Sequence, residues 1–182
     1  MTPSRSLLLS KQGDAFYNKQ DKVSSDLLYS LFGSYLSMLK SDNLSDQDIQ
    51  KDLRLCGSRV GVRLSDEFYA KHVPVTTASF FESCEMITKL GLKMYFGINS
   101  ETLVTEDSNV FAFKLIDPLE SDICIEAEQF GLADFFCGVV SGILSQLNIS
   151  VNIEVLEDSQ RELSIRISLV GYQHLVDIDI IT

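Results

Sequence analysis

Residues 132–169 have the sequence LADFFCGVVSGILSQLNISVNIEVLEDSQRELSIRISL, in which a helical pattern is followed by a strand pattern. The first part, 132–147, is almost entirely apolar and has Gly138 and Gly142 four residues apart, which predicts a buried helix that another backbone approaches closely. Apolar residues then alternate with polar ones on both sides of a polar turn at 158–161. We therefore expect an antiparallel hairpin with one apolar face after the buried helix.

Three amphipathic helices are predicted earlier in the chain, at about 24–39, 45–72 and 79–97. In each of them apolar residues recur at steps of three and four. Ser45 and Ser79 begin the second and third helices in capping-box patterns, because each is followed three residues later by an acidic residue. The third helix is expected to end at a glycine.

Strands are predicted between the third helix and the buried helix. Residues 110–116 alternate large apolar residues with Ala and Lys, and residues 123–127 repeat the pattern more briefly. A further short strand is expected at 103–105. Helices, strands, one helix and a hairpin in the order ααα-ββ-α-ββ favour an α+β fold over repeated βαβ units.

The length of 182 residues suits one compact domain, which we assign to residues 24–172. Residues 1–23 are polar, mixed in charge and without period, which predicts a flexible N-terminal arm. In the C-terminal tail, 173–182, Val and Ile alternate with Asp. This pattern suits a strand added along a sheet edge of this chain or of a partner.

The charge is divided unevenly along the chain. The whole sequence has 26 acidic and 15 basic residues, for a net charge of −11. Residues 1–100 hold 11 acidic and 12 basic residues, whereas residues 101–182 hold 15 and 3. The acidic balance argues against a nucleic-acid-binding protein, which needs clustered cations. The asymmetry favours oriented docking onto partners.

No catalytic or metal-binding motif is recognised. The chain lacks the nucleophile-elbow, zincin, P-loop and dinucleotide-binding motifs, and its two histidines have no acidic or cysteine partner at motif spacing. No segment has 18 unbroken apolar residues. The cysteines are widely spaced in apolar stretches, which predicts buried thiols in a reducing compartment: Cys56, Cys84, Cys124 and Cys137. We therefore expect a cytosolic protein that is not an enzyme and holds no metal or resident cofactor.

The second predicted helix carries a basic strip made of Lys51, Arg54, Arg59 and Arg63. Arg59 and Arg63 lie four apart, a like-charge spacing that costs a helix about 0.2–0.5 kcal/mol. One explanation is that Asp66 and Glu67, one turn further on, compensate for this repulsion. The other is that the strip binds an acidic partner or an anionic lipid surface.

Three stretches carry a resemblance to a known family. They are Gly61-Val62-Arg63-Leu64 with Phe68, Lys93-Met94-Tyr95-Phe96-Gly97-Ile98, and Phe136-Cys137-Gly138-Val139-Val140-Ser141-Gly142. Together they resemble the corresponding stretches of the small core subunits of the transport protein particle, TRAPP, and within that family the Bet-three type of subunit. The resemblance extends from about Ser24 to about Leu169.

This resemblance implies an α+β fold in which helices pack on one face of a twisted antiparallel sheet. It also implies pairing through the first two helices, as a homodimer or with a related small subunit. The interface residues would be Leu27, Leu31, Tyr35, Leu39 and Leu53. The particle would tether vesicles in transport from the endoplasmic reticulum to the Golgi and act as a nucleotide exchange factor for a Rab-type GTPase. The chain would then be cytoplasmic and peripheral at cis-Golgi and endoplasmic reticulum membranes.

The resemblance further implies a hydrophobic channel. Subunits of the Bet-three type hold an acyl chain on a cysteine at the position that Thr77 occupies here, and a threonine hydroxyl is a far poorer acyl acceptor. A fatty acid held without a covalent bond is then the expected ligand. Gly91 either keeps the channel open or lets two helices pack closely. The expected walls are Ile87, Gly91, Met94, Val139 and Ile143. A free-standing carrier of a fatty acyl or similar apolar ligand is therefore the alternative function.

Overall fold

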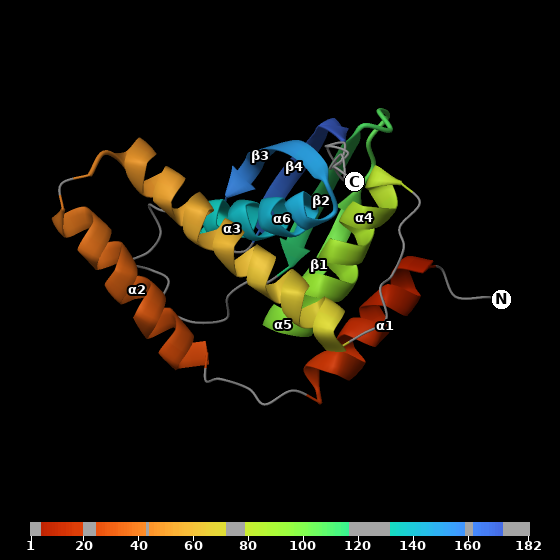
Figure 1. Cartoon of the computed structure of the whole chain (residues 1–182), viewed down its shortest axis with the longest axis horizontal. Helices are drawn as coiled ribbons and strands as arrows, with labels where there is room; N and C mark the ends of the chain where they lie inside the picture. Colours follow the sequence, from red (N-terminus) through yellow and green to blue (C-terminus); the bar gives the residue numbers. More distant parts are fainter. Residues whose placement is uncertain are drawn as a thin grey trace, which may run out of the picture.

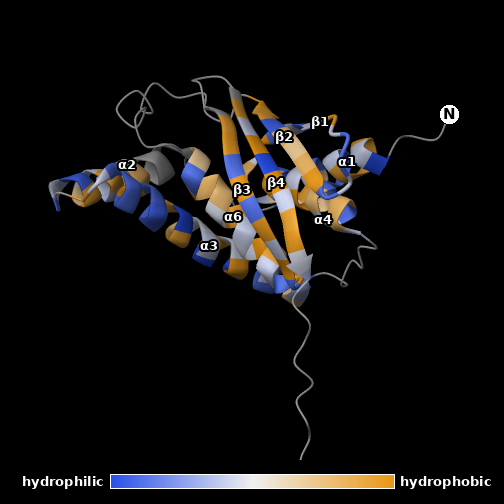
Figure 2. Ribbon diagram, turned by 90° about the horizontal axis from the view of Figure 1, so that it is seen from above, coloured by the Kyte–Doolittle hydropathy of each residue, from blue (hydrophilic) through white to orange (hydrophobic). Residues whose placement is uncertain are grey.

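The computed structural model describes residues 5–19, 25–42, 44–71, 79–116, 132–158 and 162–172. Helices lie against one side of a four-stranded antiparallel sheet, so the expected α+β class is confirmed (Figures 1 and 2). The elements are α1 (Arg5–Tyr17), α2 (Ser25–Ser41), α3 (Asp46–Lys71), α4 (Phe80–Met86), the π-helical segment η1 (Ile87–Gly91), α5 (Leu92–Phe96), β1 (Asn99–Leu103), β2 (Val110–Ile116), α6 (Leu132–Gln146), β3 (Ile149–Asp158) and β4 (Glu162–Tyr172). Among the described residues no helix is long and apolar enough to cross a membrane.

The helix boundaries follow the capping residues of the sequence. The Asp48 backbone N–H donates to Ser45 Oγ at 3.2 Å, and the Glu82 N–H donates to Ser79 Oγ at 3.2 Å. At the other end of the third predicted helix, Gly97 adopts a left-handed φ of 71°. These local signals place α3 and the continuous α4–η1–α5 helix where the sequence predicts helices.

The strand order in the sheet is β1-β2-β4-β3, with every neighbouring pair antiparallel. The predicted hairpin is the β3–β4 pair, and the alternation of apolar and polar residues along it is visible in Figure 2. Apolar side chains of β2 and β4 that point inward are fully buried: Phe111, Phe113, Leu115, Ile165 and Ile167. Packed with α6, they form the main core.

The first strand lies earlier than predicted. β1 spans Asn99–Leu103 rather than 103–105, because the chain extends directly after Gly97 and turns after Leu103. In that turn Thr105 Oγ1 donates to the Val110 carbonyl oxygen at 2.7 Å. The strand predicted at 123–127 lies outside the described residues.

Helix α3 is the element whose backbone closely approaches α6, as the glycines of α6 predict. A Cβ atom on Gly138 would lie 2.2 Å from the Arg54 carbonyl oxygen, and one on Gly142 would lie 2.2 Å from that of Ser58. Gly57 and Gly61 on α3 meet the α6 backbone in the same way. Four glycines therefore let the two helices cross with their backbones in contact.

Residues 5–17, which the sequence analysis places in a flexible arm, form helix α1 instead. In Figure 1 this helix lies beside the α4–α5 helix, and Asp14 pairs with Lys93 at 3.1 Å. Gly13 is buried against Lys93, and Tyr17 packs over Gly97. The arm was expected because its sequence has no apolar period, and docking on a distant element is not visible in a local pattern. The tail, 173–182, lies outside the described residues.

Candidate functional site

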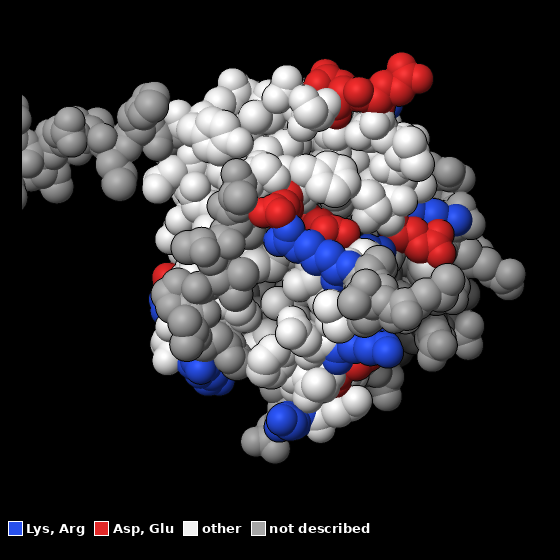
Figure 3. Space-filling model, turned by 90° about the vertical axis from the view of Figure 1, so that its right-hand side faces the viewer, with Lys and Arg blue, Asp and Glu red and all other residues white. Residues whose placement is uncertain are grey.

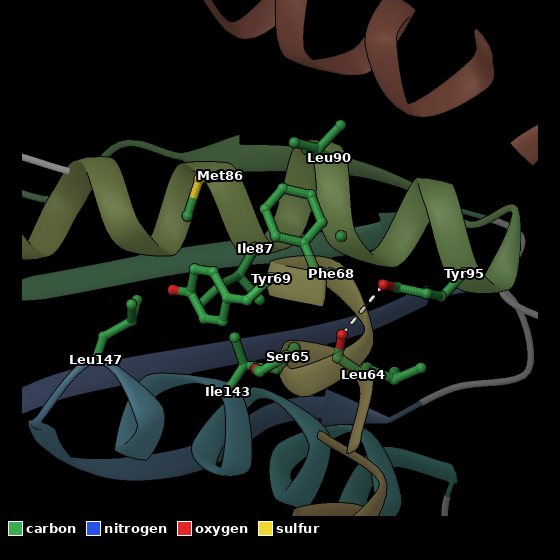
Figure 4. A pocket seen from close by; sticks show the side chains of 11 residues that line it. Leu64, Ser65, Phe68, Tyr69, Met86, Ile87, Leu90, Tyr95, Ile143 and Leu147 are labelled. Atoms are coloured by element: carbon green, nitrogen blue, oxygen red, sulfur yellow. Dashed lines mark hydrogen bonds between the residues drawn. The ribbon is translucent and has the colours of Figure 1, made fainter. Parts of the chain in front are cut away.

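An apolar pocket lies between the C-terminal half of α3, the η1 segment and the end of α6 (Figure 4). It contains about 490 Å³ of empty space, part of it open to solvent. The lining residues are Leu64, Ser65, Phe68, Tyr69, Met86, Ile87, Leu90, Gly91, Tyr95, Ile143 and Leu147.

Gly91 is what keeps this space open. A Cβ atom built on Gly91 would meet nothing within 4 Å, whereas the glycines of the α3–α6 crossing would clash with backbone. Close helix packing therefore does not explain Gly91. Two other expected wall residues, Ile87 and Ile143, line the pocket beside it.

Met94 and Val139, which we expected in the channel wall, do not line the pocket. Val139 is fully buried in the main core, where its carbonyl faces Gly61. Met94 points elsewhere because η1 is one wide turn, in which the Leu92 N–H bonds to the Ile87 carbonyl five residues back. That extra residue per turn brings Tyr95, rather than Met94, to the pocket side of the helix.

Four wall residues from α3 were missed in the sequence: Leu64, Ser65, Phe68 and Tyr69. Leu64 and Phe68 belong to the apolar stripe that predicts the second helix, and the sequence gives them no expected role in the channel. These wall residues could have been identified from the position of the stripe, because it continues beyond Gly57 and Gly61, where α3 contacts α6.

Two polar groups in the wall are bonded within the protein. Ser65 Oγ donates to the Gly61 carbonyl oxygen at 3.1 Å, and the Tyr95 hydroxyl donates to that of Leu64 at 3.1 Å. Burial, with a smaller effect of Glu67, raises the pKa of Tyr95 to about 12. Both hydroxyls thus tie the wall together and leave the space between them apolar.

The thiols lie apart from this pocket. Cys84 and Cys137 are buried and Cys56 is half-buried, and among the described residues no cluster of His, Cys, Asp or Glu could hold a metal ion. Burial raises the pKa of Cys84 well above its ordinary value, which makes this thiol unreactive. Thr77 and Cys124 lie outside the described residues.

A second surface is formed by α2 and α3. Leu31, Met38 and Leu55 are 61%, 53% and 48% exposed, and Tyr35 is half-buried. The expected interface role of Leu39 and Leu53 is corrected, because both side chains are buried within this chain.

Leu39 and Leu53 pack with Leu36 and Ile49, which joins α2 to α3. They therefore shape the α2–α3 surface without being open to a partner. The side chain of Leu27 lies outside the described residues.

The basic strip also needs one correction. Arg54 is not a free cation, because its Nε pairs with buried Asp134 at 2.7 Å and its Nη1 donates to the Ile153 carbonyl at 3.1 Å. It clamps α3 to α6 and β3. Lys51, Arg59 and Arg63 remain exposed. Glu67, one of the two acids expected to compensate for Arg63, pairs with Lys71 at 2.6 Å.

Comparison with known proteins places this geometry in a family. The model of the transport protein particle (TRAPP) component family matches residues 28–169. The chain belongs to this family. The TRAPP match contains the whole pocket and most of α2, and it begins after α1.

Individual TRAPP proteins are similar over most of their length. The transport protein particle subunit bet3 of Schizosaccharomyces pombe is 30% identical over 84% of this chain and 85% of its own. The trafficking protein particle complex subunit 3 of Dictyostelium discoideum is 28% identical over 78% of each chain.

A solved TRAPP structure is also similar. The crystal structure of the trafficking protein particle complex subunit 3 of Naegleria fowleri, covalently bound to palmitic acid, superposes with a TM-score of 0.71. It is 25% identical, and the similarity covers 84% of this chain and 99% of that one.

Proposed function

We propose that this TRAPP component is a non-catalytic core subunit of a vesicle-tethering complex that acts as a nucleotide exchange factor for a Rab-type GTPase in transport from the endoplasmic reticulum to the Golgi. The family match over residues 28–169, with relatives of the bet3 type, carries the proposal. The chain works in the cytoplasm with related small subunits, peripheral to endoplasmic reticulum and cis-Golgi membranes.

The α2–α3 surface supports the pairing step of this proposal. Large apolar side chains that are exposed together on one face commonly mark a protein–protein interface. Here Leu31 and Met38 on α2 and Leu55 on α3 are about half exposed or more. The surface therefore suits a partner with apolar groups.

The test uses the full-length chain with an affinity tag, expressed in its native cells. The chain should purify in a particle much larger than a dimer, and that particle should accelerate nucleotide release from a Rab-type GTPase. Leu31→Asp combined with Met38→Asp should release the chain from the particle. Val104→Asp, at a fully exposed position in the β1–β2 turn, is the control. A chain that purifies alone, or a particle without exchange activity, would overturn the proposal.

The pocket favours a second function, binding of an apolar ligand. This function is supported by the open space beside Gly91. The palmitic acid bound to the Naegleria fowleri protein indicates the kind of molecule to test. Mass spectrometry of the intact protein and of its organic extract should find a lipid that is released without breaking a covalent bond. An empty extract, from protein that also fails to take up added lipid, would reject this function.

A further inference from the structure

One hydroxyl in the pocket wall has no hydrogen bond within the described protein. Ser65 and Tyr95 each donate to a backbone carbonyl of α3. Tyr69 makes only an edge-on ring contact with Phe68, with ring centroids 5.9 Å apart. In Figure 4 the Tyr69 ring lies between η1 and α6, and its hydroxyl points away from Tyr95 toward the end of the pocket occupied by Leu147.

The exposure of the wall residues indicates where the pocket opens. Tyr69 is 38% exposed, whereas Ile87 and Leu90 are 2% and 4% exposed. A ligand that fills the pocket would therefore place one end beside the Tyr69 hydroxyl and its body along Ile87 and Gly91. Burial raises the pKa of Tyr69, so its hydroxyl stays protonated and can donate a hydrogen bond at neutral pH.

The other residues that line the pocket limit which kind of head group a ligand can place beside Tyr69. None of the described residues that line the pocket is Lys, Arg, Asp or Glu. A charged head group would therefore find no opposite charge among these residues to pair with. An uncharged oxygen that accepts one hydrogen bond fits the site, because Tyr69 supplies the single donor.

We propose that Tyr69 is the head-group residue of the pocket, where its hydroxyl donates a hydrogen bond to the uncharged oxygen of a single-chain lipid bound without a covalent bond. This inference rests on the proposed ligand-binding function of the pocket and adds the head-group class. A long-chain alcohol or a neutral carbonyl compound has this chemistry.

The experiment measures displacement of 1-aminoanthracene, a neutral fluorescent probe, from the full-length protein by 1-decanol, 1-chlorodecane and decanoate. The wild type should prefer 1-decanol to 1-chlorodecane by about 2- to 10-fold, the contribution of one hydrogen bond. Tyr69→Phe should reduce this preference to less than 2-fold and bind 1-chlorodecane as the wild type does. Tyr172→Phe, the same change at a half-exposed site on β4, should keep the wild-type preference.

A Tyr69→Phe protein that keeps the preference, or a wild type that binds decanoate more tightly than 1-decanol, would overturn the head-group inference. Gly91→Leu should abolish binding of all three compounds, because its side chain would enter the open space. If the wild type takes up neither the probe nor any of these compounds, ligand binding itself fails, and that failure is distinct from a failure of the Tyr69 inference.

Discussion

Gly91 and Gly142 are both glycines within helices, but their surroundings are opposite. Gly91 has helical dihedral angles, φ −64° and ψ −54°, and open space where a Cβ atom would stand. Gly142 faces the α3 backbone, where a Cβ atom would lie 2.2 Å from the Ser58 carbonyl oxygen. The same residue type thus keeps a pocket open at one position and allows two helices to touch at the other.

This contrast predicts that one substitution has opposite effects at the two positions. Gly91→Ala should raise the free energy of unfolding by about 0.5–1 kcal/mol, because Ala restricts the unfolded chain and favours the helix. Gly142→Ala should lower it by about 2 kcal/mol or more, because α3 and α6 must move apart. Urea denaturation of the two variants measures both effects. Equal changes at the two positions would contradict the described packing of one of them.

Tyr95 gives a prediction for alkaline pH. Its pKa is about 12 in the folded protein against 10.0 ordinarily, chiefly because of burial and secondarily because of Glu67. The unfolded chain therefore loses this proton first, so the stabilising contribution of Tyr95 is present below pH 10 and is lost as the pH rises toward 12. Tyr95→Phe should flatten that decline. It should also cost about 0.5–1.5 kcal/mol at neutral pH through the lost bond to Leu64.

The measurement is the free energy of unfolding in urea on both sides of pH 10 for wild type and Tyr95→Phe. The two curves should converge as the pH rises above 10. Curves that stay parallel would show that the Tyr95 proton is not linked to folding.

Helix α1 is held by a small contact area. Within α1 only Gly13 is buried, and Leu7 and Leu8 are 46% and 47% exposed. A helix of 13 residues is marginal in water by itself. The helical state of α1 therefore depends on its docking against the α4–α5 helix, where Gly13 allows the close approach to Lys93.

This dependence predicts a selective effect of one substitution. Gly13→Val should undock α1, because its Cβ would lie 2.8 Å from Lys93 Cβ. Trypsin should then cleave at Lys11 and Lys19 faster than in the wild type, while the unfolding midpoint of the remaining protein changes little. Ala15→Val, on the exposed side of α1, is the matched control. Unchanged cleavage in Gly13→Val would mean that the Gly13 contact does not hold the helix.

The elements that the sequence predicts are those defined by local signals. Capping serines, a terminal glycine and alternating strands identify α2, α3, the α4–α5 helix and the β3–β4 hairpin. Contacts between distant segments define the rest. The docking of α1 on Lys93 and the approach of Tyr69 to Ile143 each depend on a partner far along the chain, and a local pattern does not contain that information.

In the whole molecule, charges of opposite sign are mixed on one side. On the face that carries α1 and α4, acidic and basic side chains are interspersed, with an acidic group at the upper edge (Figure 3). Arg5–Glu82 and Lys93–Asp14 are ion pairs of this region. The exposed cations of α3 face away from α6, because Gly57 and Gly61 on the opposite face of that helix contact the α6 backbone.

This arrangement predicts that the remaining strip of Lys51, Arg59 and Arg63 orients the protein on an anionic membrane. Each basic residue near such a surface contributes about 1 kcal/mol, and the attraction is confined to about one Debye length. Arg59→Gln with Arg63→Gln should therefore weaken binding to vesicles of phosphatidylcholine and phosphatidylserine by about 2 kcal/mol. Lys11→Gln with Lys19→Gln removes the same charge from two exposed positions, one on α1 and one just after it. If both pairs weaken binding equally, net charge rather than the α3 strip determines the attraction, and the predicted orientation is wrong.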